Sequence, residues 1–314
     1  MSKPRVAIYY WVIPQTGFRN DGPPLFWNYN LRKLLNGDTQ MEDGERNVRH
    51  LWPVGDTSNF GKYDLHLLVD HGEDALGVPL DFEYPHPNAY VVSDAHLGYA
   101  HRLSQAKKFD FVFCNQKRAM DEFVRDGVDP KKLFWMPHAV EPDVYKPYPI
   151  IEKYDWAHIG YLNCPERVDI LDRFCKEIPN WYLGWRTPVA KGFNEMDDAA
   201  KKFCQARLIL NYNIKDDVNM RNFESLATGK CVLTKDIPTI HDLFVDGKHH
   251  RTYKSVDEAV EIAKHLLAHD EERARIGQEG LKEILAKHTY MHRVQELLEK
   301  TIGYKGVEHA VSDR

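Results

Sequence analysis

Residues 208–234 read LILNYNIKDDVNMRNFESLATGKCVLT, two apolar runs separated by a polar stretch. The apolar runs are typical of buried strands in a parallel sheet. The polar stretch predicts a loop and then a helix that Gly229 ends. Two carboxylates stand eight residues apart, with Asp216 expected in the loop at the carboxyl end of a strand and Glu224 inside the helix. Open α/β sheets bind their ligands at this edge.

The composition describes a globular protein of 314 residues with 43% hydrophobic and 28% charged residues, enough for two domains of ordinary size. A net charge of −5 argues against a chain-wide surface for nucleic acid or anionic membranes. The five cysteines include no Cys-x-x-Cys pair, which predicts a reduced, cytoplasmic protein. No stretch reaches the roughly 20 apolar residues of a membrane span, and the first apolar run is interpreted as a strand rather than a signal peptide.

Apolar runs and helical patterns alternate along the whole chain, which predicts βαβ units, parallel sheets and the α/β class. Strands are expected at 5–12, 64–69, 89–93, 110–114, 133–137, 156–161, 181–184, 207–212 and 231–234. Helices are expected at 116–126, 165–178, 195–205, 220–229 and 289–302, with a further one that begins at a capping box of Ser255 and Glu258.

A proline-rich stretch at 142–155 interrupts this alternation, because its three prolines suit neither a helix interior nor a central strand. The sequence therefore predicts a Rossmann-like domain at 1–147, a second one at 148–288, and a final helix with a frayed tail at 289–314. Each of the two larger parts has about the length of one such domain.

The start of the helix near residue 220 is a candidate anion site. Free N–H groups and the positive end of the helix dipole favour an anion there. A diphosphate would meet the backbone near Asn222 and Phe223, together with the side chains of Asn219 and Arg221. Glu224 lies in the run Phe-Glu-Ser-Leu-Ala, whose other positions are expected to be buried, so its charge requires a partner. The alternative for the two carboxylates is an ordinary turn residue and an ordinary helix residue.

Asp216 and Glu224, with Ala-Thr-Gly at 227–229 and the strand that follows, resemble the "E-x7-E" signature of retaining GT-B glycosyltransferases of the group 1 type. The run at 218–224 resembles most closely the CgeB-like, or spore-maturation-type, branch. The resemblance covers about 86–302, and the loop at 17–24 is a weak counterpart of the family's glycine-rich loop. It implies two Rossmann-like domains whose parallel sheets face each other across a cleft, with the final helix crossing back to the first domain.

The resemblance also implies roles for individual residues. In the family, the second acid, here Glu224, bonds the nucleotide ribose, and the first, here the shorter Asp216, lies near the sugar hydroxyls. His96, at the end of a strand, would approach the donor sugar; the alternative is a structural histidine. Arg167 would be the second of two cations that hold the diphosphate, and Tyr161 stands where the first is expected. The alternative for Arg167 is a surface arginine.

Three further groups of residues lie outside this set. Asp94 and His96 could suggest a metal site, but no further ligands cluster near them in the sequence and the related fold needs no catalytic metal, so no metal is expected. Trp11, Trp27 and Trp52 are candidates for an acceptor surface, because aromatic rings can stack on a sugar. The alternative is that they belong to the core, as most aromatic residues do, and they are left out of the predicted site. The pair at 249–250, His-His, follows Asp-Gly-Lys and is predicted to lie in a solvated turn.

The resulting hypothesis is a metal-independent glycosyltransferase with no cofactor beyond its nucleotide-sugar co-substrate, for which the family favours UDP over GDP. It would transfer the sugar, with retention, to an acceptor hydroxyl of a glycan, a protein, a small molecule or modified DNA. Two alternatives stay open. One is a nucleotide-sugar 2-epimerase of the same fold, and the other is a non-catalytic nucleotide- or sugar-binding protein, which Asp216 and Tyr161 would suit.

Overall fold

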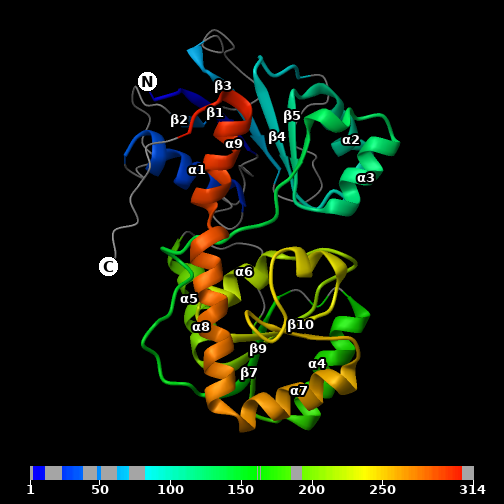
Figure 1. Ribbon diagram of the computed structural model, residues 1–314, viewed down its shortest axis with the longest axis vertical. Coiled ribbons are helices and arrows are strands. Elements are labelled where there is room, and N and C mark those ends of the chain that lie inside the picture. The colour runs from blue at the N-terminus through cyan, green and yellow to red at the C-terminus, as the bar shows by residue number, and fades with distance from the viewer. Residues whose placement is uncertain are drawn as a thin grey trace. The chain divides into compact units, whose positions relative to one another are not determined.

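The computed structural model describes residues 3–10, 23–37, 48–50, 62–70, 82–160, 162, 164–184 and 193–305. The chain separates into two compact units, labelled by element in Figure 1. The first unit holds the described residues up to Pro137 and those from Tyr290 onwards, and the second holds those from His138 to Thr289. No helix within the described ranges is both long and apolar enough to cross a membrane.

The first unit is built on a six-stranded parallel sheet with the order β2-β1-β3-β4-β5-β6. Its strands are β1 (Val6–Tyr9), β2 (Val48–His50), β3 (Leu65–Val69), β4 (Asn88–Val92), β5 (Phe111–Cys114) and β6 (Leu133–Trp135). Its helices are α1 (Pro23–Leu35), α2 (Tyr99–Lys108), α3 (Lys117–Arg125) and α9 (Tyr290–Ile302), and a 3-10 turn, η2, spans Pro130–Lys132.

The last helix, α9, packs beside α1 within this unit, as the red and blue ribbons of Figure 1 show. Phe26 and Trp27 of α1 contact the ring of Tyr290, with centroids 5.1 and 6.2 Å apart. Trp27 is therefore a buried core residue rather than part of an acceptor surface. Trp27 is buried because α9, which is far away in the sequence, packs on this part of α1. Trp11 and Trp52 lie outside the described residues.

The second unit is built on a five-stranded parallel sheet with the order β11-β10-β9-β7-β8. Its strands are β7 (Tyr154–Ile159), β8 (Trp181–Gly184), β9 (Ala206–Asn211), β10 (Cys231–Lys235) and β11 (Arg251–Tyr253). Its helices are α4 (Pro165–Glu177), α5 (Phe193–Cys204), α6 (Met220–Leu226), α7 (Val256–Ala268) and α8 (Asp270–Lys287), with a 3-10 turn, η3, at Pro238–Asp242. The apolar runs that predict strands form the buried centre of this sheet.

Helix α8 reaches the sheet through two glycines. A Cβ atom on Gly277 would collide with the carbonyl oxygen of Gly229, and one on Gly280 would collide with that of His249. Any larger residue would overlap with backbone, so α8 can approach this closely only because both positions are glycine. The helix thereby covers the chain between α6 and β10 and the turn that precedes β11.

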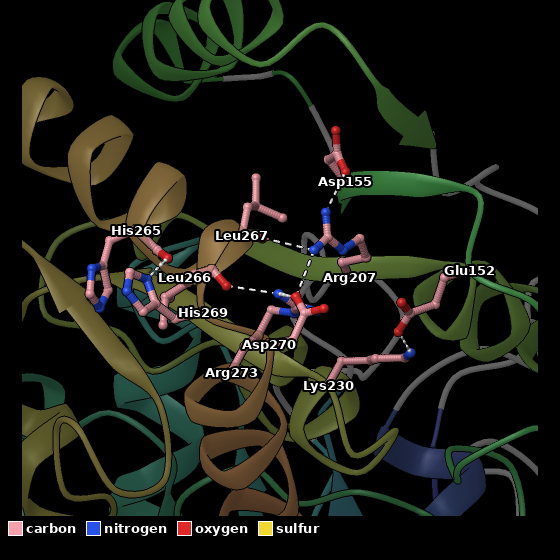
Figure 2. A network of polar contacts seen from close by, with 10 residues as sticks. All are labelled: Glu152, Asp155, Arg207, Lys230, His265, Leu266, Leu267, His269, Asp270 and Arg273. Carbon is pink, nitrogen blue, oxygen red and sulfur yellow. Dashed lines mark hydrogen bonds and ion pairs between the residues drawn. The ribbon is translucent and has the colours of Figure 1, made fainter.

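A network of ionic hydrogen bonds holds the other end of α8, at the amino ends of β7 and β9 (Figure 2). Arg207 of β9 donates to Asp155 at 3.0 Å, to the carbonyl oxygen of Leu267 at 2.8 Å and to Asp270 at 2.7 Å. Arg273 of α8 donates to the same Asp270 oxygen at 2.7 Å. The network joins the turn between α7 and α8 to the edge of the sheet that is formed by the amino ends of its strands.

The predicted α/β class with two Rossmann-like parallel sheets is confirmed, and most of the expected strands and helices lie within two residues of their predicted ends. The structure adds the short strands β2 and β11, whose Val-Arg-His and Arg-Thr-Tyr sequences form no apolar run. It also places the two prolines at 23–24 in the first turn of α1, where a missing N–H costs nothing. Ser255 caps α7 by accepting from the N–H of Glu258 at 3.2 Å, while the Glu258 carboxylate accepts from the N–H of Lys254.

The histidine pair at 249–250 corrects one expectation, because both side chains are buried rather than solvated. Helix α8 covers this turn through Gly280, a packing contact that a local sequence pattern does not reveal. His250 is 1% exposed and meets the ring of Phe244 edge-on, with centroids 5.8 Å apart. Neither of its ring nitrogens has a hydrogen-bond partner among the described residues. Burial lowers the pKa of His250 to about 4.

This burial predicts a specific loss of stability in mild acid. The pKa of His250 in the folded protein lies below its ordinary value of 6.5, so the unfolded chain binds the proton first as the pH falls. The stabilising contribution is complete above pH 6.5 and is lost as the pH falls towards 4, with a loss of about 2 kcal/mol at pH 5. Between pH 8 and pH 5, the free energy of unfolding measured in urea should therefore fall by about 2 kcal/mol less in His250→Leu than in the wild type. Parallel losses in the two proteins would contradict the assignment.

Candidate functional site

The candidate site lies at the carboxyl ends of β7, β9 and β10 in the second unit, where a network of side-chain amides is buried. The amide nitrogen of Asn211, the last residue of β9, lies within 3.1 Å of three acceptors, on Asn213, Asn222 and Thr234. Asn213 in turn accepts from the amide of Asn222 at 2.8 Å. Buried polar groups are costly unless they are paired, and a fully connected network fixes a single arrangement. The network therefore sets the start of α6 relative to β9 and β10.

Helix α6 begins at Asn219, whose side chain does not cap it. The Asn219 amide instead donates to the carbonyl oxygen of Tyr212 at 3.2 Å and to Asn213 at 3.2 Å. Because α6 has only seven residues, its dipole is a weak source of positive potential. Most of the positive charge of the site therefore comes from side chains.

Arg221, in the first turn of α6, extends to the ends of two strands. Its Nη1 atom donates to the side-chain oxygen of Asn211 at 2.9 Å. Its Nη2 atom occupies the space above Gly160, directly after β7, and would overlap with a Cβ atom there. Gly160 is therefore a seat for the guanidinium group, which any larger residue would displace.

Arg167, in the first turn of α4, is 5% exposed and is not the surface arginine of the alternative interpretation. Its Nη2 atom donates to the carbonyl oxygen of Tyr212 at 3.3 Å. Burial lowers the pKa of Arg167, although a guanidinium group keeps its charge in proteins. Arg167 and Arg221 are thus attached to consecutive residues, Tyr212 and Asn211. Tyr161, the position of the other expected cation, lies outside the described residues.

The two carboxylates lie where the spacing predicts, Asp216 in the loop after β9 and Glu224 in α6. Asp216 accepts from the N–H of Thr239 at 3.0 Å and from its hydroxyl at 2.7 Å, and so anchors the start of η3. Glu224 is 5% exposed. Phe223 packs against the rings of Phe244 and other core residues, so its side chain is structural.

Lys235 and His158 are among the residues of this edge that were not predicted. Lys235, the last residue of β10, donates to the hydroxyl of Tyr212 at 3.0 Å and lies 4.5 Å from the centre of its ring. His158 lies inside β7 and is buried. The signal for each is a polar residue next to the apolar residues of a strand, since a buried strand has no solvent to receive a polar side chain.

His96 belongs to the first unit, whereas the other candidate residues belong to the second. It is exposed after β4, and its Nδ1 atom lies 3.4 Å from the amide nitrogen of Gln116. Nearby Asp94 has a left-handed backbone, with φ of 47°, and burial raises the pKa of its carboxyl. No three His, Cys, Asp or Glu side chains form a metal-binding group within the described ranges.

Comparisons with known proteins add a family match over part of the chain and a fold. Residues 170–299 match the model of the "Glycosyl transferase-like" family, a match that includes α6 and begins just after Arg167. No protein of curated function matches the chain significantly. HepE from Anabaena, solved with UDP and glucose, has a TM-score of 0.62 at 12% identity, with 95% of this chain and 99% of HepE covered.

Two further structures are similar over large parts of the chain. Sucrose-phosphate synthase from Thermosynechococcus elongatus has a TM-score of 0.66 at 10% identity, with 95% of this chain and 98% of that chain covered. A mutant of S. aureus TarM, solved with fondaparinux, α-GlcNAc-glycerol and UDP, has a TM-score of 0.56 at 12% identity. That match covers 76% of this chain and 55% of TarM. The chain has the GT-B fold. At these identities the likeness extends to the fold alone, and residues 170–299 carry in addition the sequence pattern of a glycosyl transferase-like domain.

The amide network predicts that Asn211→Leu, a change of similar volume, destabilises the protein by about 3 kcal/mol, because it leaves several buried donors and acceptors without a partner. The measurement is the free energy of unfolding in urea. Asn180→Leu is the matched control, since Asn180 is exposed and its side chain donates to the carbonyl oxygen of Lys153. The control should cost less than about 1 kcal/mol. Equal costs for the two variants would show that the network adds nothing to stability.

Proposed function

We propose that the protein is a glycosyltransferase that moves a sugar from a nucleotide-diphosphate sugar to an acceptor hydroxyl. The observation that carries this proposal is the pair of guanidinium groups, of Arg167 and Arg221, attached to consecutive residues at the carboxyl edge of the second sheet. Planar guanidinium groups are well suited to bind phosphate oxygens by two parallel hydrogen bonds. A diphosphate between them is the ligand that this arrangement favours.

The chemistry requires control of charge. When the bond between the anomeric carbon and the diphosphate breaks, positive charge develops on the sugar and the diphosphate gains negative charge. Donors that are already in place for that negative charge stabilise the transition state, a contribution that is often the largest in catalysis. In the proposal, Arg167 and Arg221 supply this stabilisation together with the first N–H groups of α6, and the reaction needs no metal ion.

The remaining assignments follow the resemblance to retaining enzymes. Glu224 would bond the ribose hydroxyls, and Asp216 would bond hydroxyls of the donor sugar through the lone pairs that Thr239 leaves unused. By the same resemblance, His96 is assigned to the donor sugar and the first unit to the acceptor. With retention, a diphosphate oxygen would take the proton of the acceptor hydroxyl on the face that the leaving group vacates.

UDP is the proposed nucleotide, because HepE and TarM, which share the fold, were solved with UDP. The run at 218–224, with Arg221 at its centre, supports a place in the CgeB-like branch. The five free cysteines support a reducing compartment, and we propose the cytoplasm. The acceptor is a glycan, a protein, a small molecule or modified DNA.

Thermal unfolding with UDP, GDP, UDP-glucose, UDP-GlcNAc and GDP-mannose tests the proposal. A nucleotide at 100 times its Kd should stabilise the folded protein by about 2.7 kcal/mol. We expect a shift with the uridine series that is lost in Glu224→Ala, because the ribose then loses its charged acceptor. Gly160→Ala should weaken the same shift by displacing the tip of Arg221, while leaving the unliganded protein folded.

Lys176→Ala is the matched control for this series, since it removes a cation from the exposed face of α4, where Lys176 pairs with Asp172. It should leave the nucleotide shift unchanged. If none of the nucleotides raises the temperature of unfolding, the proposal is wrong and the protein does not bind a nucleotide at this site. Binding without release of UDP from any donor would favour the non-catalytic alternative.

A further inference from the structure

His158, in the middle of the second sheet, is a buried histidine with a defined tautomer. It is 1% exposed, and its Nδ1 atom lies 2.9 Å from the carbonyl oxygen of Leu210 on the neighbouring strand β9. A carbonyl oxygen can only accept a hydrogen bond, so Nδ1 carries the proton. In the neutral ring, Nε2 is then an acceptor with a lone pair.

That lone pair has no hydrogen-bond partner among the residues that the structure describes. A buried acceptor without a partner destabilises a protein, so such an atom requires an explanation. Burial, and then the charges of Arg221 and Arg167, lower the pKa of His158 well below its ordinary value. The imidazole therefore stays neutral at physiological pH, and both guanidinium groups are close enough to influence it.

The geometry of the strand places one donor on the same face as the imidazole. Side chains two residues apart on a strand point to the same face of the sheet, so His158 and position 160 share a face. Position 160 is a glycine, and the Nη2 atom of Arg221 occupies the space of its missing side chain. The guanidinium group of Arg221 therefore borders the imidazole of His158 on one face of β7.

We propose that His158 is a positioning residue whose Nε2 atom accepts an N–H of Arg221 while that guanidinium group binds a diphosphate. This inference rests on the proposed function. Asn211 accepts from one side of the guanidinium group, and His158 would accept from a second side, which fixes the plane of the group and directs its remaining N–H groups at the anion.

The choice of a histidine at this position has a physical reason. A carboxylate would also orient Arg221, but it would cancel the positive charge that the leaving diphosphate requires. A protonated imidazole would repel the guanidinium group. A neutral acceptor held by Leu210 orients the cation and leaves its charge intact.

The test compares two replacements in calorimetric titrations with UDP. His158→Phe keeps a ring and removes the acceptor, whereas His158→Gln keeps an acceptor and a donor. Because a hydrogen bond to a charged group contributes about 1.5–3 kcal/mol, we expect His158→Phe to raise the Kd for UDP roughly tenfold or more. His158→Gln should restore most of that loss. Because His158→Phe also removes the donor to Leu210, a second background separates positioning of Arg221 from this structural bond. In an Arg221→Gln background, His158→Phe should cause little further loss.

Each outcome decides the inference. An unchanged Kd in His158→Phe, or the same loss in the Arg221→Gln background, would overturn it and leave the proposed function standing. Failure of the wild type to bind UDP, or any nucleotide of the panel, would overturn both. If His158→Phe does not fold, nitrogen NMR of histidine-labelled wild type decides instead. The inference requires the Nε2 resonance of His158 to shift when UDP is added, and an unmoved resonance would contradict it.

Discussion

The rest of the candidate site depends on two hydrogen bonds from guanidinium groups to the end of one strand. Arg221 donates to the side chain of Asn211, and Arg167 donates to the carbonyl oxygen of Tyr212. Two positive charges are thereby attached to consecutive residues at the edge of a parallel sheet. An arrangement of this kind is stable only if rigid polar partners surround it, and it is suited to bind an anion that carries more than one charge.

The fold supplies this rigidity from several directions. The amide network around Asn213 joins the end of β9 to the start of α6 and to β10. Gly160 opens a seat for the Arg221 side chain on the neighbouring strand. Helix α8 packs through Gly277 against the chain that follows α6, and the ionic network around Arg207 holds the first residue of α8, Asp270. The site is thus positioned by contacts on both edges of the sheet.

The sequence predicted those parts of the structure that depend on local patterns. Apolar runs located most of the strands, and the spacing of Asp216 and Glu224 placed one carboxylate in a loop and the other in a helix. Arg221 was identified because it stands at the start of that helix. The GT-B fold followed from the resemblance to a family, and the structural comparisons confirm it.

What the sequence did not predict depends on contacts between distant segments. The seat at Gly160 exists only because Arg221, 61 positions later in the chain (221 − 160), folds over it. Trp27 is indistinguishable from a surface aromatic until α9 packs on α1. Burial by a remote helix leaves no mark on the local sequence.

A crystal structure of the protein with UDP would show directly which groups hold the diphosphate. We expect the diphosphate to lie between Arg167 and Arg221, with phosphate oxygens within about 3.2 Å of nitrogen atoms of both guanidinium groups. The uracil and ribose would then extend towards Glu224. A diphosphate bound elsewhere on the protein, or one that touches neither arginine, would show that the two cations do not form the donor site.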